Sequence, residues 1–185
     1  MGSLKNEKYY DTIYEKSIEY SKPYDKSVYY GLWKKVMSLI TKQPILEGGC
    51  GPGQFAKMLE DNSFKDYIGF DFSEQAIKMA KKNSNQIFSV MDALLGKWPQ
   101  YHFNTILLLE ILEHTDDLKI LSLVPIGKEI ILTVPNFDCD SHIRHFTTID
   151  SVISRYGPYM DIIHAENFNS NASTWYIIKG IKREM

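Results

Sequence analysis

The feature that most constrains the fold is the stretch Pro44–Phe55, which reads PILEGGCGPGQF. A short apolar run ends in Glu47, a glycine-rich turn follows, and an amphipathic run begins at Phe55. This order predicts a strand, a tight loop and a helix. Asp71 comes one helix-plus-strand unit later, at the end of a second strand-like run. Glycines let a backbone approach a ligand and such an acid accepts from ribose hydroxyls, so the pattern predicts a nucleoside site.

The glycine spacing narrows the class of nucleoside. Gly49, Gly51 and Gly53 form G-x-G-x-G, whereas the dinucleotide fingerprint G-x-G-x-x-G would place its third glycine where Gln54 stands. Glu47, just before the loop, would repel a pyrophosphate and attract an ammonium group. A ligand with an adenosine, a cation and no phosphate therefore fits better than a nicotinamide dinucleotide.

The glycine loop resembles that of the class I S-adenosylmethionine (SAM)-dependent methyltransferases, in which E-x-G-x-G-x-G follows a strand and an acid closes the next strand. Residues 89–93, 103–114 and 129–136 match the ends of the third, fourth and fifth strands of that family, in the same order. The likeness spans roughly residues 40 to 180. It implies an enzyme that uses SAM and releases S-adenosylhomocysteine.

Strand and helix patterns alternate along most of the chain. Strands are predicted at 44–49, 67–71, 87–91, 103–109 and 129–134, and helices at 54–61, 73–83, 116–123 and 147–155. Two β-rich runs, 160–164 and 174–181, are separated by the turn-rich run 167–171. The sequence thus predicts an α/β fold: a doubly wound, Rossmann-like, mostly parallel sheet of seven strands with a C-terminal antiparallel hairpin.

The first part of the chain differs in composition from the rest. Residues 1–43 are rich in tyrosine, and we expect two helices broken near Pro23 that form a helical cap or lid. Residues 44–185 are expected to form one compact SAM-binding domain.

The resemblance implies which residues contact SAM. Glycine-loop amides would face its methionine part, Glu47 its amino group, Asp71 the ribose, Phe72 the adenine face and Asp92 the adenine amino group. Simpler roles are a strand-end cap for Glu47, a helix N-cap for Asp71 and a solvated loop acid for Asp92. The full predicted set is Glu47, Gly49, Cys50, Gly51, Gly53, Asp71, Phe72, Met91, Asp92, Ala93 and Glu110.

Candidate catalytic residues are His114, His142 and His145. His114 could be a general base with a pKa near neutrality. Alternatively, Glu110, Glu113 and His114 could bind a divalent metal with His142 or His145, since Glu-x-x-Glu-His resembles quinone O-methyltransferases and small-RNA 2′-O-methyltransferases, which are metal-linked. The third possibility, which we favour on sequence alone, is a family signature that shapes the SAM pocket without metal.

Substrate contacts are predicted for Tyr14, Tyr20 and Arg144. Arg144 and His145 could instead anchor their loop, with Thr147 or Thr148 capping the next helix. The chain has no large inserted domain, so we expect methyl transfer to an oxygen or nitrogen of a small-molecule acceptor. Metal-linked RNA 2′-O-methylation and a non-catalytic SAM-binding partner protein remain alternatives.

The composition of the chain indicates which partners to expect and in which cellular compartment the protein lies. The net charge of −2 argues against broad nucleic-acid binding. No apolar run is long enough to cross a membrane, and the start lacks a secretory signal core. The two cysteines form no metal motif or disulfide framework, so we expect a reduced, cytoplasmic protein.

Overall fold

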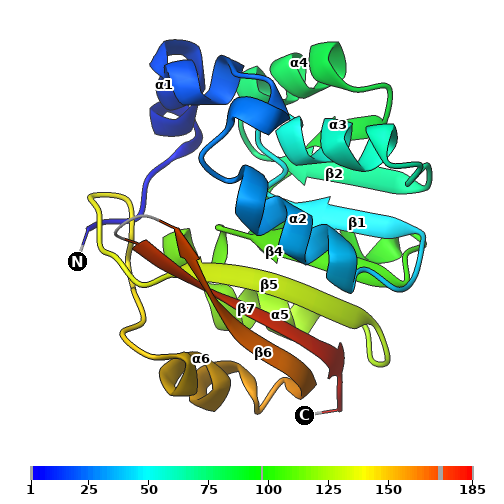
Figure 1. The fold of residues 1–185 in the computed structure, drawn as a ribbon, viewed down its shortest axis with the longest axis vertical. Helices are drawn as coiled ribbons and strands as arrows, with labels where there is room; N and C mark the ends of the chain where they lie inside the picture. The colour runs from blue at the N-terminus through cyan, green and yellow to red at the C-terminus, as the bar shows by residue number, and fades with distance from the viewer. Residues whose placement is uncertain (1, 97, 171–172, 185) are drawn as a thin grey trace.

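The computed structural model describes residues 2–96, 98–170 and 173–184. Its centre is one seven-stranded sheet in the order β3-β2-β1-β4-β5-β7-β6 (Figure 1). The neighbours from β3 to β5 are parallel, and β7 runs antiparallel to both β5 and β6. The predicted fold class is confirmed. The strands are β1 Ile45–Gly48, β2 Tyr67–Asp71, β3 Ile87–Val90, β4 Thr105–Leu109, β5 Glu129–Pro135, β6 Met160–Ser170 and β7 Ser173–Lys182.

Helices cover both faces of this sheet (Figure 1). Buried residues of α2, α3 and α4 form one apolar cluster with one face, and those of α5 and α6 form a second cluster with the other. The Ser73 hydroxyl accepts from Ala76 N at 3.0 Å, so Ser73 is the N-cap of α4. The helices are α1 Glu7–Lys16, α2 Tyr30–Leu39, α3 Gln54–Asp61, α4 Glu74–Asn83, α5 Asp117–Leu123 and α6 Ile149–Tyr156.

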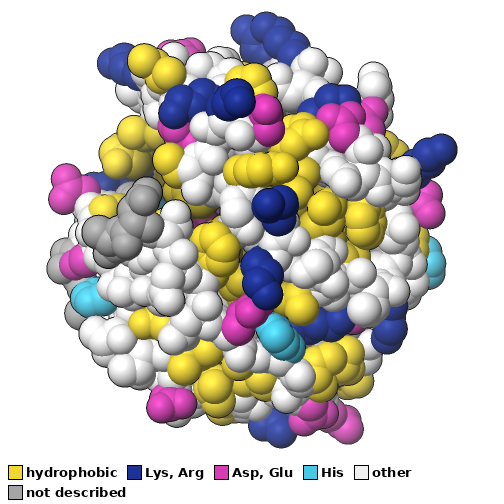
Figure 2. Space-filling view, in the orientation of Figure 1, with side chains coloured by type: hydrophobic (Ala, Val, Ile, Leu, Met, Phe, Trp, Pro, Cys, Tyr) yellow, Lys and Arg dark blue, Asp and Glu magenta, His cyan; other side chains and the backbone are white. Residues whose placement is uncertain are grey.

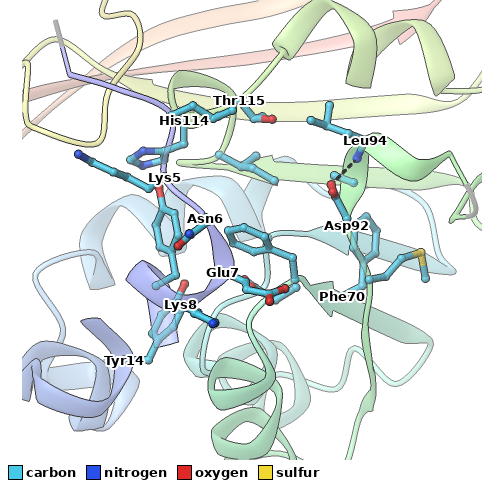
Figure 3. Close-up of a pocket in the computed structure, with 18 of the residues that line it drawn as sticks. Lys5, Asn6, Glu7, Lys8, Tyr14, Phe70, Asp92, Leu94, His114 and Thr115 are labelled. Carbon is cyan, nitrogen blue, oxygen red and sulfur yellow. Dashed lines mark hydrogen bonds between the residues drawn. The ribbon is translucent and has the colours of Figure 1, made fainter. Parts of the chain in front are cut away.

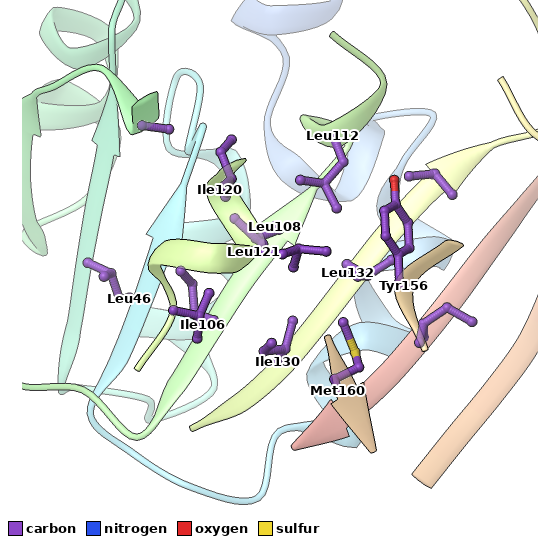
Figure 4. Packing of buried hydrophobic residues seen from close by; sticks show 14 of the residues in the cluster. Leu46, Ile106, Leu108, Leu112, Ile120, Leu121, Ile130, Leu132, Tyr156 and Met160 are labelled. Atoms are coloured by element: carbon purple, nitrogen blue, oxygen red, sulfur yellow. The ribbon is translucent and has the colours of Figure 1, made fainter. Parts of the chain in front are cut away.

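The central strands are buried along their whole length, as parallel strands covered on both faces must be. Leu108 of β4 and Leu132 of β5 pack with Leu121 of α5 and Tyr156 of α6 (Figure 4). This core fixes the sheet, so the carboxyl ends of β1, β2, β4 and β5 present their loops at a rigid edge.

The N-terminal region contains the two predicted helices. The second begins at Tyr30, later than the apolar residues at helical spacing in 27–41 indicate. Two short 3₁₀ turns, Ile18–Ser21 and Tyr24–Lys26, separate α1 from α2. The Glu19 carboxylate accepts from Ser27 Oγ at 2.9 Å and from Val28 N at 2.8 Å. These bonds hold an extended backbone before α2, so local capping outweighs the helical pattern at 27–29.

The C-terminal hairpin is longer than predicted. Asn167, Phe168 and Asn169 fall in the run expected to be a turn, yet they pair with β7. The ring of Phe168 explains this: it contacts Trp175, and its Cζ lies 2.8 Å from where a Cβ on Gly31 would be. Tertiary packing thus extends the strand through polar residues. The end of the predicted turn, at 171, lies outside the described residues.

In the described part of the chain, no helix is long and apolar enough to cross a membrane. The face shown in Figure 2 carries lysine, arginine, aspartate and glutamate side chains interspersed with apolar ones. This face therefore presents no broad field of one sign.

A buried ion pair joins β5, β7 and the end of α2, and its removal tests the packing. Lys179 Nζ lies 3.0 Å from Glu129 Oε2 and donates to Leu39 O at 2.7 Å. Lys179→Met leaves Glu129 without its charge partner in a buried position, so the free energy of unfolding should fall by about 3 kcal/mol. Urea denaturation measures this, with the exposed Lys119→Met as control; equal stability of the two variants would contradict the packing.

Candidate functional site

The glycine loop after β1 takes the backbone path for which glycine is suited. Gly49, Gly51 and Gly53 have φ values of 71°, 51° and 74°, in the left-handed region. A Cβ on Gly49 would lie 2.8 Å from Ile111 Cδ1, and one on Gly53 would lie 2.9 Å from the backbone of Ala80. The loop is therefore held against the turn after β4 on one side and against α4 on the other.

The loop amides were expected to face the ligand, but those of Gly49, Cys50, Gly51 and Gly53 all donate within the protein, Gly53 N to Cys50 O at 3.2 Å. Gly49 N and Cys50 N both donate to Phe70 O, at 2.8 and 3.0 Å, and Gly51 N donates to Asp71 Oδ2 at 3.0 Å. The neighbouring strand end needs these donors to close the turn. Because the glycines carry no side chains, a ligand can still approach the main chain of the loop closely.

Asp71 combines the helix-entry role with a place in the ligand cavity. Its Oδ1 accepts from Ser73 N at 2.9 Å, beside the start of α4, while Oδ2 holds Gly51 N. The side chain is buried, and burial raises its pKa to about 6 against the two backbone donors that lower it. The carboxylate also lines a cavity of about 510 Å³ at this edge of the sheet.

Glu47 is buried beneath the loop and accepts a hydrogen bond from the hydroxyl of Tyr67 on β2. Gly69 makes room for this contact, since a Cβ there would lie 2.9 Å from the Tyr67 oxygen. Burial raises the pKa of Glu47 to about 8, although the tyrosine hydroxyl lowers it.

Two cavities flank the loop. The main cavity, about 510 Å³, lies between the ends of β1, β2 and β4 and the N-terminal segment 4–14 (Figure 3). Its volume is in the range of ordinary ligand pockets. Asp92 lines it and also accepts from Leu94 N at 2.8 Å, as the dashed line in Figure 3 shows. The sequence-predicted residues that line it are Tyr14, Gly49, Asp71, Phe72, Met91, Asp92, Ala93, Glu110 and His114.

The loop cavity is smaller, about 90 Å³, and lies on the other side of the glycine loop. Tyr14 and Tyr20 meet there with ring centroids 4.8 Å apart. Gly53 lines neither cavity and instead begins α3. The predicted residues around the loop cavity are Tyr14, Tyr20, Glu47, Gly49, Cys50, Gly51 and Glu110.

Glu110 lines both cavities from the end of β4. Its φ of 54° is unusual for a residue other than glycine, and its amide donates to Thr133 O and Oγ1. Carboxylate oxygen Oε2 accepts from Trp175 Nε1 at 2.7 Å, while Oε1 is buried without a partner. Burial raises its pKa to about 7.

Of the two loop histidines, the structure brings His142 and not His145 to His114. The rings of His114 and His142 lie 4.7 Å apart, whereas His145 is exposed. Glu113, His114 and His142 form a group whose potential ligand atoms lie within 4.8 Å of one another. Burial lowers the pKa of His114 to about 4, below the near-neutral value expected of a general base.

Arg144 clamps two loops together. Its Nη1 donates to Leu112 O and to Thr115 O, and its Nη2 lies 3.3 Å from Asp117. These contacts hold the Arg144 guanidinium against the turn that carries His114. Thr148, the alternative predicted cap, accepts from Ser151 N at 3.2 Å at the start of α6.

Sequence reasoning missed the residues that act through distant contacts. Tyr67 stands at the start of its strand and carries no local signal of its bond to Glu47. Asp11 of α1 reaches α4, where it accepts from Ser73 Oγ at 2.5 Å, and Tyr10 places its ring between those of Phe72 and His114. Only the clustering of tyrosines in 1–43 indicated that this region approaches the site.

The chain belongs to the methyltransferase domain family, whose model matches residues 25–156. It is a SAM-dependent methyltransferase domain, and its cofactor is S-adenosylmethionine. No curated protein matches its sequence significantly.

Solved structures share the fold at low sequence identity. A SAM-dependent methyltransferase from Anabaena variabilis is 15% identical with a TM-score of 0.71, covering 99% of each chain. Magnesium protoporphyrin IX methyltransferase from Synechocystis, solved with bound SAM, is 15% identical with a TM-score of 0.65, covering 98% of this chain and 99% of that one. The N-methyltransferase NodS from Bradyrhizobium japonicum is 16% identical with a TM-score of 0.61, covering 86% and 99%.

The raised pKa of Glu47 predicts a pH dependence of stability. Because its folded pKa of about 8 exceeds the unfolded value, its contribution is full below pH ~4.5 and is lost as the pH rises through 8. Between pH 5 and pH 8.5, the unfolding free energy of the wild type should therefore fall relative to that of Glu47→Gln. Urea denaturation at the two values measures this, with the exposed Glu184→Gln as control; parallel pH profiles for wild type and Glu47→Gln would refute it.

Proposed function

We propose that this domain transfers the methyl group of SAM to an oxygen or nitrogen of a small-molecule acceptor. The observation that carries this proposal is that the N-terminal segment covers one side of the main cavity. Leu4, Asn6 and Tyr10 line the cavity, and Gly2 N, just before them, donates to His142 O at 2.7 Å. A cavity covered on one side by the chain's own N-terminal segment admits a small molecule more readily than a folded polymer.

The cofactor would lie along the carboxyl ends of β1, β2 and β4. Asp71 would accept from the ribose hydroxyls, Asp92 from the adenine amino group, and Phe72 would pack on the adenine. The methionine part would follow the main chain of the glycine loop, with its amino group toward Glu47. This course uses both cavities, which meet at Gly49 and Glu110.

Methyl transfer needs alignment more than activation. The sulfonium already activates the methyl carbon, so the protein must hold the acceptor in line and exclude water. Tyr14, which lines both cavities, and Tyr20, which contacts it in the loop cavity, would contact the acceptor. Region 1–43 would act as a lid over this arrangement, since Asp11 fastens α1 to α4 directly beside Asp71.

Two further features support the small-molecule proposal. The net charge is −2, and the face in Figure 2 mixes charges of both signs, so this face offers RNA no extended basic surface. Cys50 and Cys139 are both unpaired thiols, in keeping with a cytoplasmic protein.

Isothermal titration with SAM and S-adenosylhomocysteine tests cofactor binding. Asp71→Asn should weaken both affinities by about 10- to 100-fold, because a charged acceptor is lost from a buried site. The control is Asp66→Asn, an exposed aspartate just before the same strand, which should bind as wild type. Unchanged affinity in Asp71→Asn, with its fold verified by circular dichroism, would refute the assigned ribose contact.

Acceptor class is tested with SAM labelled in its methyl group. We expect label in at least one compound of a panel of phenols, hydroxy acids and amines, and none in short RNAs. Label in RNA would overturn the small-molecule proposal. Tight cofactor binding without transfer to any compound would favour a non-catalytic SAM-binding protein.

A further inference from the structure

Three side chains with metal-ligating atoms meet at one wall of the main cavity. Glu113 and His114 lie on the turn after β4, and His142 lies on the loop after β5. One potential ligand atom from each lies within 4.8 Å of the others. His114 lines the cavity, while Glu113 is 0% and His142 4% exposed. The cluster is therefore sheltered from bulk water and still adjoins the cavity.

The Glu113 carboxylate has no hydrogen-bond partner among the described residues. Both of its oxygens are buried without a hydrogen bond. His114 Nε2 lies 3.7 Å from Oε1, beyond hydrogen-bond reach, and Arg144 is occupied by Leu112, Thr115 and Asp117. A buried carboxylate left in this state is costly, and a bound cation would remove the cost.

Both histidines are oriented as metal ligands usually are. His114 Nδ1 lies 3.0 Å from Ser141 O, and His142 Nδ1 lies 3.0 Å from Phe137 O. A carbonyl oxygen only accepts, so each Nδ1 carries the hydrogen and each Nε2 keeps its lone pair.

We infer that Glu113, His114 and His142 form a binding site for a divalent metal ion of the first transition row. Two imidazoles and one carboxylate suit Zn²⁺ or Mn²⁺, whereas Mg²⁺ and Ca²⁺ prefer oxygen ligands throughout. In a four-coordinate site such ligand atoms lie about 3.4 Å apart, so a small inward movement of the side chains completes the set. Glu110, held by Trp175, and the exposed His145 lie outside it.

The role of this ion rests on the proposed function. A hydroxyl acceptor in the main cavity would take an open coordination position next to His114. With an ion held by Glu113, His114 and His142, coordination would lower the pKa of that hydroxyl, and its proton would pass to solvent. The oxygen then forms a bond to the methyl carbon while the carbon–sulfur bond breaks, leaving its electron pair on the sulfur of S-adenosylhomocysteine. The geometry thus favours acceptors with a metal-binding hydroxyl, such as catechols or hydroxy acids.

The site is tested by titrating metal-free protein with Mn²⁺ alone, followed by electron paramagnetic resonance, and with Zn²⁺ against a chromophoric chelator. We expect one ion per chain, with affinity reduced at least tenfold in Glu113→Gln and in His142→Ala. His145→Ala is the matched control, since it removes an exposed histidine from the same loop and should bind as wild type. A rise in the wild-type melting temperature with added metal is a second readout that needs no variant.

Wild-type protein that binds no stoichiometric metal would overturn the inference, as would equal binding in Glu113→Gln and His142→Ala. S-adenosylhomocysteine titrations on the same samples separate the two proposals. Cofactor binding without metal binding overturns only the metal site. Metal binding without cofactor binding leaves the site in place and overturns the proposed methyl transfer.

Discussion

The carboxylate of Asp71 makes the contact on which the site depends. One oxygen holds Gly51 N and the other holds Ser73 N, so a single side chain joins the loop after β1 to the entry of α4. Both bonds are made within the protein, and the loop therefore has its shape before a ligand arrives. Preorganisation of this kind lowers the entropy cost of binding.

The sheet order explains why a cavity forms beside this contact. The chain moves outward from β1 to β3 and then returns to place β4 on the other side of β1. Loops after β1 and β4 therefore leave the sheet in opposite directions, which opens the crevice where ligands bind in such folds. Gly49 and Ile111 contact each other in this crevice, and the lack of a Cβ on Gly49 lets the two loops come this close.

Sequence patterns correctly predicted those elements whose conformation depends mainly on residues nearby in the chain. The apolar run at 105–109 could only be a buried strand, and G-x-G-x-G before an amphipathic helix could only be a tight loop. The loop amides were predicted wrongly because their partner, Phe70 O, belongs to a neighbouring strand. The same holds for the extent of β6, which depends on the packing of Phe168 against Trp175 and Gly31.

The pairing of His114 with one of the two loop histidines shows the same limit of sequence reasoning. His142 and His145 are equally plausible in sequence, and the choice between them follows from the path of their loop. Arg144 fixes that path by bonds to Leu112 O and Thr115 O, and the burial of Phe146 turns His145 outward. Neither contact has a signature in the local pattern, since the partners lie far apart along the chain.

The most direct measurement is a crystal structure of the protein grown with S-adenosylhomocysteine. The account predicts the ribose on Asp71, the adenine between Phe72 and Asp92, and the methionine part along Gly49–Gly51, with little change in the loop. A ligand bound elsewhere, or a glycine loop that rebuilds to point its amides at the ligand, would contradict a site preorganised by Asp71.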